Sequence, residues 1–379
     1  MIVYGAKALD TPTIIKAIQD KEKENVRIGH LQDYYEGRHD ILLRHYEDST
    51  KPNNRIVVNY CKDIADFITA YVVGVPVTYD APEAIEKALA YNDDGAETQD
   101  VVHDMVVCGF ACELFYTDEN GDVRYNNLDP AECIIFMNDD LQSDITGFVR
   151  IVKRPDPIGG YLVTVYDDTH TQDFVCDSAV SELTAVSEKS EHHFGDVPVV
   201  FYPNGQDMQG NFEQIIPLQD ALNKVVSDSV NDWESFVDSY LVLEGMQGTT
   251  PEDIAEMKAN RVLLTDADSK AYWLTKQADN DRVKTMQDDL RTMILELGNV
   301  PDMQDITGLS VSGEAMKFRL TKTEIQASRI ERIVTRGIQR KVELLYKVLS
   351  LTGDNMAYTE VVPVFTRNFI MGESNEVTE

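Results

Sequence analysis

The chain has 379 residues, of which 43% are hydrophobic, enough for one large core or two to three smaller ones. Glycine contributes 21 residues and proline 13, which excludes collagen-like and low-complexity classes. Acidic residues number 66 against 34 basic ones, and the resulting charge of −32 repels nucleic acid and anionic membranes. Any contact with DNA must therefore be local.

Five cysteines, an odd number in a long chain, argue against a disulfide framework and for a reducing compartment. Cys108 and Cys112 lie in an apolar run where free cysteine is usually a small core residue, and no matching second pair exists for zinc. The N-terminal residues lack the pattern of an export signal, and no apolar run reaches the ~18 residues of a membrane span. We expect a soluble protein without membrane contact, intracellular when made.

The first 110 residues are predicted to be mainly helical. Thr11-Pro12 starts a helix, residues 59–73 carry apolar side chains at helical spacing, and residues 100–110 close the group. From Ala111 the pattern changes to that of strands. This change predicts an α+β domain.

The strand region contains a strong hairpin signal. Asn120-Gly121 lies between the strand-like residues 113–116 and 123–125, and this dipeptide favours a tight two-residue turn. Further strands are predicted at residues 133–137, 147–153, 161–166 and 196–202.

A long amphipathic helix of roughly 25 residues follows the loop 203–205. Its apolar stripe runs from Leu218 to Tyr240 and includes Trp233. The opposite face is predicted to be wet and acidic because it carries the following polar residues: Asp220, Asn223, Lys224, Ser227, Asn231, Glu234 and Asp238.

A small insertion at residues 245–279 interrupts the helices, with a helix start at Pro251 and strand-like segments at 261–265 and 271–275. The next helix carries a stripe of Val283, Met286, Leu290, Met293 and Leu297 and ends at Gly298 and Pro301.

A very long helix is predicted from residues 312–313 to about Leu351, with Gly337 as the place for a kink. Residues 311–347 contain nine basic and four acidic side chains, so basic charge is concentrated in this segment.

Signatures of catalysis are absent from the sequence: no P-loop, GxGxxG, HExxH or GxSxG pattern occurs. Residues 118–122 imitate the start of a calcium loop, but position 127 is Asn where a bidentate Glu is needed, so a hairpin turn is the better interpretation. Residues 191–193 with Asp196 are a weak metal candidate. We expect no enzyme activity, cofactor or metal.

An alternative hypothesis of a different class remains, a metal-dependent nuclease or phosphoesterase that uses acidic clusters. The pairs Asp139-Asp140 and Asp167-Asp168 are the candidates, although both lie beside predicted turns, where solvated acids are ordinary.

The order of elements resembles the portal proteins of tailed bacteriophages, in the subgroup of phages with long non-contractile tails. YYEGRHDI (34–41) resembles the family's YYxGxHxI, and KPNNRIVVNYC (51–61) with YVVGVPV (71–77) resembles its KxNNRIxxNY and YxxGxPV segments. Further similar motifs are NLDP (127–130), FGDVPVV (194–200), LQDALN (218–223) and SGEAMK (312–317).

The resemblance implies an α+β wing, a two-helix stem, a clip, a tunnel loop and a crown. The implied regions are the wing 1–214 with the long helix 313–351, the stem helices 215–243 and 280–299, the clip 244–279, the tunnel loop 301–312 and a short crown stub 352–379.

By resemblance, roughly twelve copies would form a ring at one capsid vertex through which double-stranded DNA is packaged and ejected. The implied partners are further copies of the chain, the terminase large subunit, a head–tail adaptor, major capsid and scaffolding proteins, and weakly bound double-stranded DNA. The implied location is the virion, after assembly in the host cytoplasm.

Three groups of site residues follow from this resemblance. Five polar residues of the tunnel loop would face the DNA: Asp302, Gln304, Asp305, Thr307 and Ser310. Four would form the wet face of the stem: Asp220, Lys224, Glu234 and Asp238. Four in the clip would dock the motor and the adaptor: Glu252, Asp253, Lys258 and Arg261.

Overall fold

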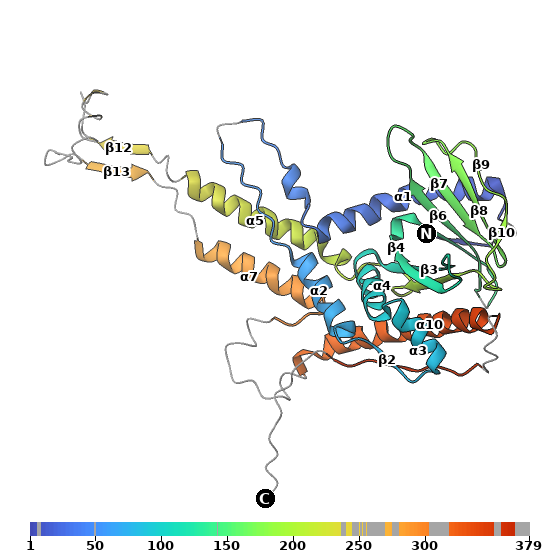
Figure 1. The fold of residues 1–379 in the computed structure, drawn as a ribbon. Coiled ribbons are helices and arrows are strands. Elements are labelled where there is room, and N and C mark those ends of the chain that lie inside the picture. Colours follow the sequence, from blue (N-terminus) through green and yellow to red (C-terminus); the bar gives the residue numbers. More distant parts are fainter. Residues whose placement is uncertain are drawn as a thin grey trace, which may run out of the picture. The chain divides into compact units, whose positions relative to one another are not determined.

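The computed structural model of the chain contains helices and mostly antiparallel strands, which confirms the α+β class (Figure 1). It divides into two compact units: unit 1 comprises Met1–Arg38, Asn59–Ile216 and Ile294–Glu379, and unit 2 comprises His39–Val58 and Pro217–Met293. The structure describes residues 1–5, 9–48, 51–141, 143–235, 240–244, 250, 252, 255, 270–274, 280–302, 318–351 and 358–367.

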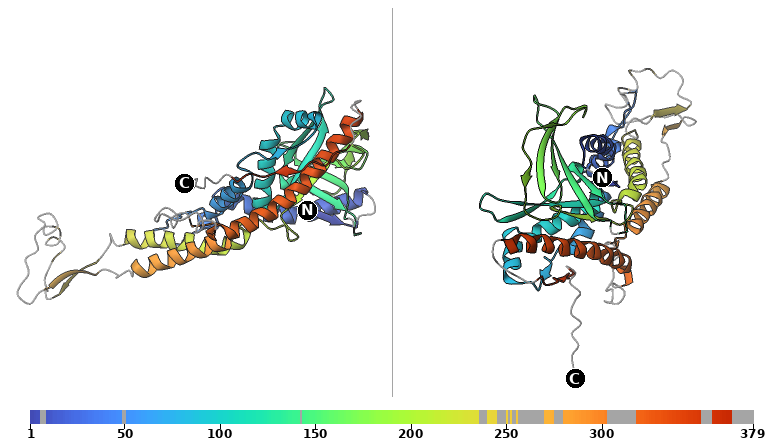
Figure 2. Two further views of the ribbon diagram at one scale, coloured as in Figure 1. Left: turned by 90° about the horizontal axis from the view of Figure 1, so that it is seen from below. Right: turned by 90° about the vertical axis from the view of Figure 1, so that its right-hand side faces the viewer.

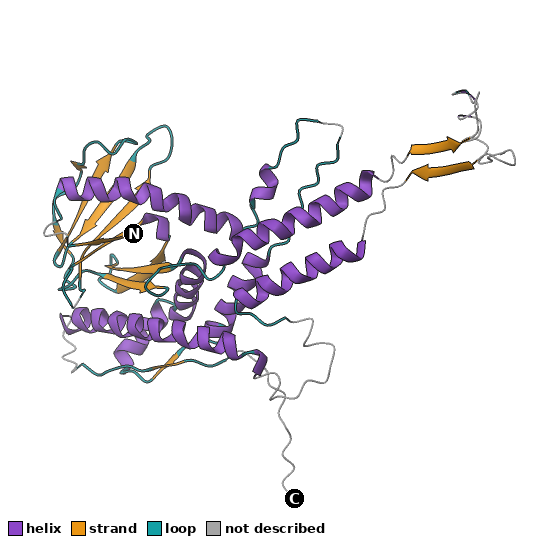
Figure 3. Cartoon of the chain, turned by 180° about the vertical axis from the view of Figure 1, so that it is seen from behind, coloured by secondary structure: helices purple, strands orange, loops and turns teal. Residues whose placement is uncertain are grey.

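Helices supply most of the regular structure (Figure 3). The α-helices are α1 Thr11–Tyr35, α2 Tyr60–Val73, α3 Glu83–Tyr91, α4 Asp94–Cys108, α5 Ile216–Ser235, α7 Asn280–Leu297 and α10 Thr321–Leu351. Short 3-10 turns occur at η1 Asp40–Leu43, η2 Pro130–Glu132 and η3 Glu213–Ile215.

The larger sheet of unit 1 has the strand order β1-β5-β6-β7-β8-β10, with β9 beside β8. Strand β1 runs parallel to β5, and the other pairs are antiparallel. These strands are β1 Ile2–Tyr4, β5 Cys133–Met137, β6 Ile145–Lys153, β7 Tyr161–Tyr166, β8 His170–Cys176, β9 Thr184–Ala185 and β10 Ser190–Glu191.

Three smaller sheets complete the described chain. In unit 1, β11, β3 and β4 pair in that order and β14 pairs with β2, whereas β12 pairs with β13 in unit 2. Their bounds are β2 Thr78–Tyr79, β3 Phe110–Thr117, β4 Val123–Leu128, β11 Val199–Pro203, β12 Tyr240–Glu244, β13 Lys270–Leu274 and β14 Pro363–Val364.

Helix α1 begins where the sequence predicts and covers the larger sheet. The Asp10 carboxylate accepts the Thr13 N–H at 3.0 Å and caps the first turn. Ile14 and Ile18, four residues apart, pack with Phe136 of β5 in the main hydrophobic core, which continues onto β6 and β7. The helix therefore gains its stability from this apolar stripe.

The boundary between α4 and β3 differs from the prediction. The helix ends at Cys108, and Phe110, predicted as its last residue, instead begins β3. Gly109 has φ +90° and caps the helix in the left-handed region, and a Cβ there would lie 1.9 Å from the Met208 carbonyl oxygen. The predicted boundary was wrong because this close approach of residue 208 is not local in sequence.

The β3–β4 hairpin confirms the Asn120-Gly121 signal. The Asp118 carboxylate accepts the N–H groups of Asn120 and Asp122, so the imitation of a calcium loop is a turn held by its own acid. Strands β5 and β7 have the predicted bounds, β6 starts two residues earlier and β11 starts three residues later. Helix α3 and strand β8 were not predicted.

Helix α10 is one continuous element through Gly337 (Figure 2). It packs against β11, α2 and α3 within unit 1. A Cβ on Gly337 would lie 1.8 Å from a ring carbon of Tyr202, so the glycine admits an aromatic ring and does not mark a kink as predicted. Of the predicted start of this helix, residues 312–317 lie outside the described residues.

Unit 2 corrects the predicted extent of the first long helix. Helix α5 ends at Ser235, and Tyr240, predicted to continue its stripe, is the first residue of β12. Strand β13 starts and ends one residue before the predicted segment 271–275. The predicted segment 261–265 lies outside the described residues. Helix α7 ends at Leu297, before Gly298, as expected.

All five cysteines are buried and free, and a core position was predicted for Cys108 and Cys112. Among the described residues, no helix combines the length and the apolar character that crossing a membrane requires.

Candidate functional site on helices α5 and α7

One face of α5 holds the irregular segment 54–58 of unit 2. Gln219, Asn223, Ser227 and Asn231 recur every four residues and so share one helix face. These polar side chains offer oxygen acceptors at steps of about 6.0 Å along the helix, which nearly match the ~6.6 Å that two extended residues span. The two periods bring alternate backbone groups of the segment onto successive side chains.

The hydrogen bonds follow this match. The Val58 N–H donates to Asn223 Oδ1 at 2.9 Å, and the Ile56 N–H donates to Ser227 Oγ at 2.9 Å. The Asn54 N–H donates to Asn231 Oδ1 at 2.8 Å. Helix side chains thus take the place of a neighbouring strand for this segment. We call residues 54–58 the strap.

The strap overturns part of the predicted wet face. Gln219, Asn223 and Ser227 have no exposed surface, and Asn223 Nδ2 also contacts His39 Nδ1 at 2.8 Å. The prediction was wrong for Asn223 and Ser227 because polar side chains on a helix serve equally well to satisfy a buried backbone. The spacing of four was visible in the sequence, but its partner lies more than 160 residues away.

The four residues predicted for the wet face have different environments. Lys224 and Glu234 are exposed, Asp220 is half-buried, and Asp238 lies outside the described residues. Glu234 also accepts a hydrogen bond from the Asn54 side chain at 2.9 Å. Arg44, 13% exposed, places a guanidinium nitrogen 2.7 Å from Asp228, which holds the chain before the strap to the same helix.

Several apolar side chains of α5 and α7 remain in water. Leu222 and Leu290 are buried, but Trp233 is 73% exposed and Met286 is 50% exposed. Met293 is also exposed. The predicted stripes are therefore buried at some positions and exposed at others within one copy of the chain.

The remaining predicted site residues fall largely outside the described chain. In the predicted tunnel loop Asp302 is half-buried, whereas Gln304, Asp305, Thr307 and Ser310 lie outside the described residues. In the predicted clip Glu252 is exposed, whereas Asp253, Lys258 and Arg261 lie outside them. The β12–β13 pair, Tyr240 opposite Leu274 through Glu244 opposite Lys270, belongs to this region.

A buried ionic cluster in unit 1, which the sequence did not indicate, fixes α10. The Lys341 side chain is 1% exposed, and its Nζ lies 2.7 Å from both Asp94 Oδ1 and Glu113 Oε1. Tyr125 donates to Asp94 at 2.8 Å, and Tyr202 donates to Glu113. These residues join α10, α4, β3, β4 and β11.

The cluster shifts the pKa values of its members. Burial raises the pKa of Glu113, and the nearby Lys341 ammonium does not offset this. Burial acts to raise the pKa of Asp94 too, but Lys341 and the tyrosine hydroxyls outweigh it, and the pKa is lowered. Burial acts to lower the pKa of Lys341, but the two carboxylates raise it. A charged lysine is therefore retained in the interior.

The acidic pairs of the nuclease hypothesis are part of turns. The Asp140 carboxylate accepts the Ser143 N–H at 3.1 Å, and the Asp167 carboxylate accepts the Thr169 N–H at 2.9 Å. Within the described part of the chain, no three His, Cys, Asp or Glu side chains are placed to hold a metal ion. These acids stabilise turns, and the geometry gives the alternative no support.

Comparisons with known proteins agree with the sequence resemblance. The family model described as "Phage portal protein, SPP1 Gp6-like" matches residues 15–379. The portal protein of Clostridium phage phiCD119 is 22% identical over 386 residues, covering 90% of this chain and 82% of the relative. That of Bacillus phage SPP1 is 23% identical over 414 residues, covering 100% of this chain and 81% of the relative.

A chain in the solved virion of a native gene transfer agent particle is 12% identical, with a TM-score of 0.48 and coverage of 80% of this chain and 79% of that one. The family model spans nearly the whole sequence and both curated relatives are portal proteins. The chain therefore belongs to the SPP1 Gp6-like family of phage portal proteins.

Proposed function

We propose that about twelve copies of this portal protein form a closed ring at one capsid vertex, through which double-stranded DNA is packaged and later ejected. Helices α5 and α7 would form the stem of each copy, residues 244–279 the clip, residues 301–312 the tunnel loop and residues 352–379 a crown stub. The wing would comprise residues 1–214 and α10. The chain would do no chemistry itself, since a separate ATPase would drive the DNA.

The exposed apolar side chains on α5 and α7 carry this proposal. Trp233 and Met286 lie on the predicted apolar stripes, yet each leaves half or more of its surface in water. Burying such side chains against a neighbouring copy contributes about 1.5–3 kcal/mol each. A stem packed between neighbours would supply that burial.

The acidic composition fits a conduit for DNA. Twelve copies of a chain with charge −32 would together carry a formal charge of −384 (12 × −32). A wall of this kind repels phosphate and gives weak, non-specific contact where a DNA-binding protein would use a basic surface. Weak contact suits a channel that must let its cargo slide.

The proposed partners follow the stages of assembly. In the host cytoplasm the ring would contact scaffolding and major capsid proteins, and the clip would dock the terminase large subunit. After packaging, a head–tail adaptor would replace the motor in the virion. Deleting residues 248–276 should abolish binding of the terminase large subunit while the deleted chain still assembles. Retained binding would exclude the clip as the docking surface.

The tunnel loop offers the sharpest test of the path of the DNA. Replacing Asp302 and Asp305 by Lys adds four positive charges per copy, so attraction to phosphate should slow or stall packaging while rings still form. The defect should grow as salt is lowered, because screening of charges weakens. DNA packaged into procapsids, measured by nuclease protection, is the readout.

Glu182 and Glu188, both exposed in unit 1, provide the matched control. Replacing them by Lys adds the same charge outside the proposed channel and should leave packaging unchanged. Wild-type packaging by the Asp302→Lys, Asp305→Lys variant at low salt would remove residues 301–312 from the channel.

A further inference from the structure

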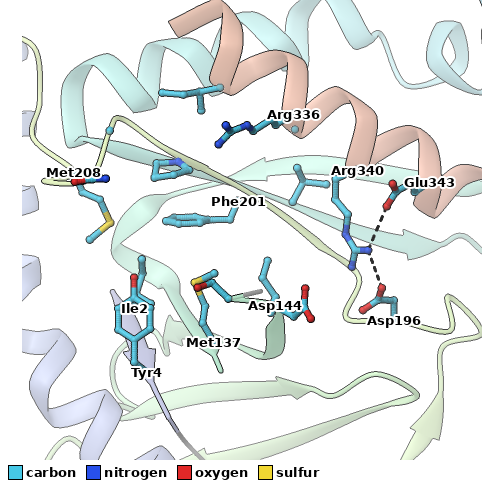
Figure 4. Close-up of a pocket in the computed structure, with 18 residues that line it drawn as sticks. Ile2, Tyr4, Met137, Asp144, Asp196, Phe201, Met208, Arg336, Arg340 and Glu343 are labelled. Atoms are coloured by element: carbon cyan, nitrogen blue, oxygen red, sulfur yellow. Dashed lines mark hydrogen bonds and ion pairs between the residues drawn. The ribbon is translucent and has the colours of Figure 1, made fainter. Parts of the chain in front are cut away.

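A cavity of about 840 Å³ in unit 1 lies between strand edges and α10. Figure 4 shows Ile2, Tyr4 and Met137 on one side and Phe201 and Met208 on the other, with arginines of α10 along the top. The lining combines apolar side chains with charged ones. We call it the edge pocket.

Strand β1 contributes an unpaired edge to the edge pocket. The Ile135 N–H donates to the Met1 carbonyl, and the Gly5 N–H donates to the Met137 carbonyl. Alternate residues of a strand pair with the same neighbour, so the backbone groups of Ile2 and Tyr4 face away from β5. Strand β1 is the last strand of its sheet, and its outer edge is open among the described residues.

Strand β11, the first in the order β11-β3-β4, contributes a second edge that is open in the described part of the chain. The Phe115 N–H donates to the Pro198 carbonyl, and the Asn204 N–H donates to the Gly109 carbonyl, both at 2.8 Å. The even-numbered residues thus pair with β3, which directs the backbone N–H and C=O of Phe201 outward. Phe201 and Ile2 both line the cavity. An added strand would find backbone partners there.

A basic stripe leads along α10 to this pocket. Lys322, Arg329, Arg332 and Arg336 are exposed and lie within one helix face about 21 Å long. No carboxylate of the described residues pairs with any of the four, although Arg329 does contact the Asn204 carbonyl oxygen at 3.4 Å. Arg336 lines the pocket, whereas its neighbour Arg340 is engaged by Asp196 at 2.7 Å.

These features favour a polypeptide over nucleic acid. The strand edges that are open among the described residues and apolar side chains such as Ile2 and Phe201 suit an extended peptide, whereas a nucleic acid has no peptide backbone to pair with them. Arg332 and Arg336, which no carboxylate of the described residues pairs with, would select acidic side chains at one end of that peptide. A chain with charge −32 supplies acidic segments from its own surface.

We infer that the edge pocket and the basic stripe receive an extended acidic segment from a second copy of this chain. Because one patch is basic and its partner patch is acidic, the contact joins two different surfaces of neighbouring copies. Such a head-to-tail contact gives a ring when the rotation between copies closes, whereas a symmetric dimer uses the same surface twice. The inference rests on the proposed ring and specifies where neighbouring copies meet.

Thiol labelling tests the occupancy of the edge pocket. Tyr4 is 61% exposed and the native cysteines are buried, so a cysteine introduced by Tyr4→Cys is the site that maleimide should reach. In purified rings it should react at least about tenfold more slowly than in monomers, because the neighbour covers it. Val186→Cys, at a position 56% exposed and outside the pocket lining, is the control and should react equally in both.

A charge reversal tests the recognition itself. Arg332→Glu with Arg336→Glu should lower the fraction of rings at least about tenfold, because like charges would meet across the contact. Arg332→Lys with Arg336→Lys should assemble normally. Both side chains are exposed, so circular dichroism of the monomers should match the wild type.

The outcomes separate the inference from the proposed function. Rings in which Tyr4→Cys reacts as fast as in monomers would overturn the inference and leave the ring intact. Protection of Tyr4→Cys in monomers by added duplex DNA would overturn it in favour of nucleic acid. A wild-type chain that never forms rings would contradict both.

Discussion

Lys341 illustrates how a single residue can fix a long helix to a domain. Its ammonium lies between two buried carboxylates, and tyrosine hydroxyls supply further hydrogen bonds to them. Such a network is costly to desolvate, so its presence is weak grounds for stability. Its stronger consequence is specificity, because only one rotation of α10 brings Lys341 between Asp94 and Glu113.

Removing Lys341 should therefore be far more damaging than removing an exposed lysine. Lys341→Met leaves Asp94 and Glu113 without a buried counter-charge and should lower the free energy of unfolding by about 3–5 kcal/mol. Lys347→Met, on the same helix but 41% exposed, should cost within about 1 kcal/mol. Urea unfolding followed by circular dichroism gives both values. Equal losses would show that the cluster does not act as a unit.

Asp196 makes part of the stability dependent on pH. Burial would raise its pKa, but hydrogen bonds from Arg340 and Lys347 outweigh this and lower the pKa to about 2 from an ordinary value of 3.8. The unfolded chain thus binds this proton more readily, so the contribution is complete above pH 3.8 and is lost as pH falls towards 2.

Asp196→Asn should remove this share of the acid sensitivity. After allowing for solvent screening of a partly exposed ion pair, the share is about 1 kcal/mol. Urea unfolding of wild type and variant at several pH values between 4 and 2 measures it. Parallel curves for the two proteins would contradict the assignment.

At the scale of elements, the strap links residues 54–58 to helix α5, which is distant in sequence but belongs to the same unit. Ser227→Ala leaves the Ile56 N–H without its acceptor, at a cost of about 1–3 kcal/mol. Amide hydrogen exchange at Ile56 should become faster, and exchange at Val58, which donates to Asn223, should change less. Lys224→Ala, exposed on the same helix, should leave both amides as in the wild type.

Local patterns were enough to predict much of the fold. The start of α1 at Thr11, the Asn120-Gly121 turn and the bounds of β5 and β7 depend on neighbouring residues and were predicted. The sequence analysis placed Gly109 inside a helix and a kink at Gly337. Both predictions were wrong because the groups that leave no room for a side chain there, the Met208 carbonyl and the Tyr202 ring, are distant in sequence. The strap and the Lys341 cluster were not predicted for the same reason, because their residues come together only after folding. The predicted domain division and the roles of the loop residues remain predictions.

At the scale of the whole molecule, the exposed side chain of Trp233 offers a test of the proposed ring. A residue 73% exposed contributes little to one copy, so Trp233→Asp should leave circular dichroism and thermal unfolding of the monomer unchanged. In a packed interface between copies the new charge would be unpaired, which should weaken the interface by several kcal/mol. Fewer rings should therefore form. Trp233→Phe should keep most of the ring. Native mass spectrometry reports the masses of the assemblies, and normal rings of Trp233→Asp would exclude this side chain from the contact.

The most direct test of the ring is electron microscopy of the purified full-length chain in negative stain at several salt concentrations. The account predicts closed rings of about twelve copies with a stain-filled central hole, because head-to-tail contacts related by about one twelfth of a turn close on themselves. Single copies, symmetric dimers or open filaments at every salt concentration would contradict it.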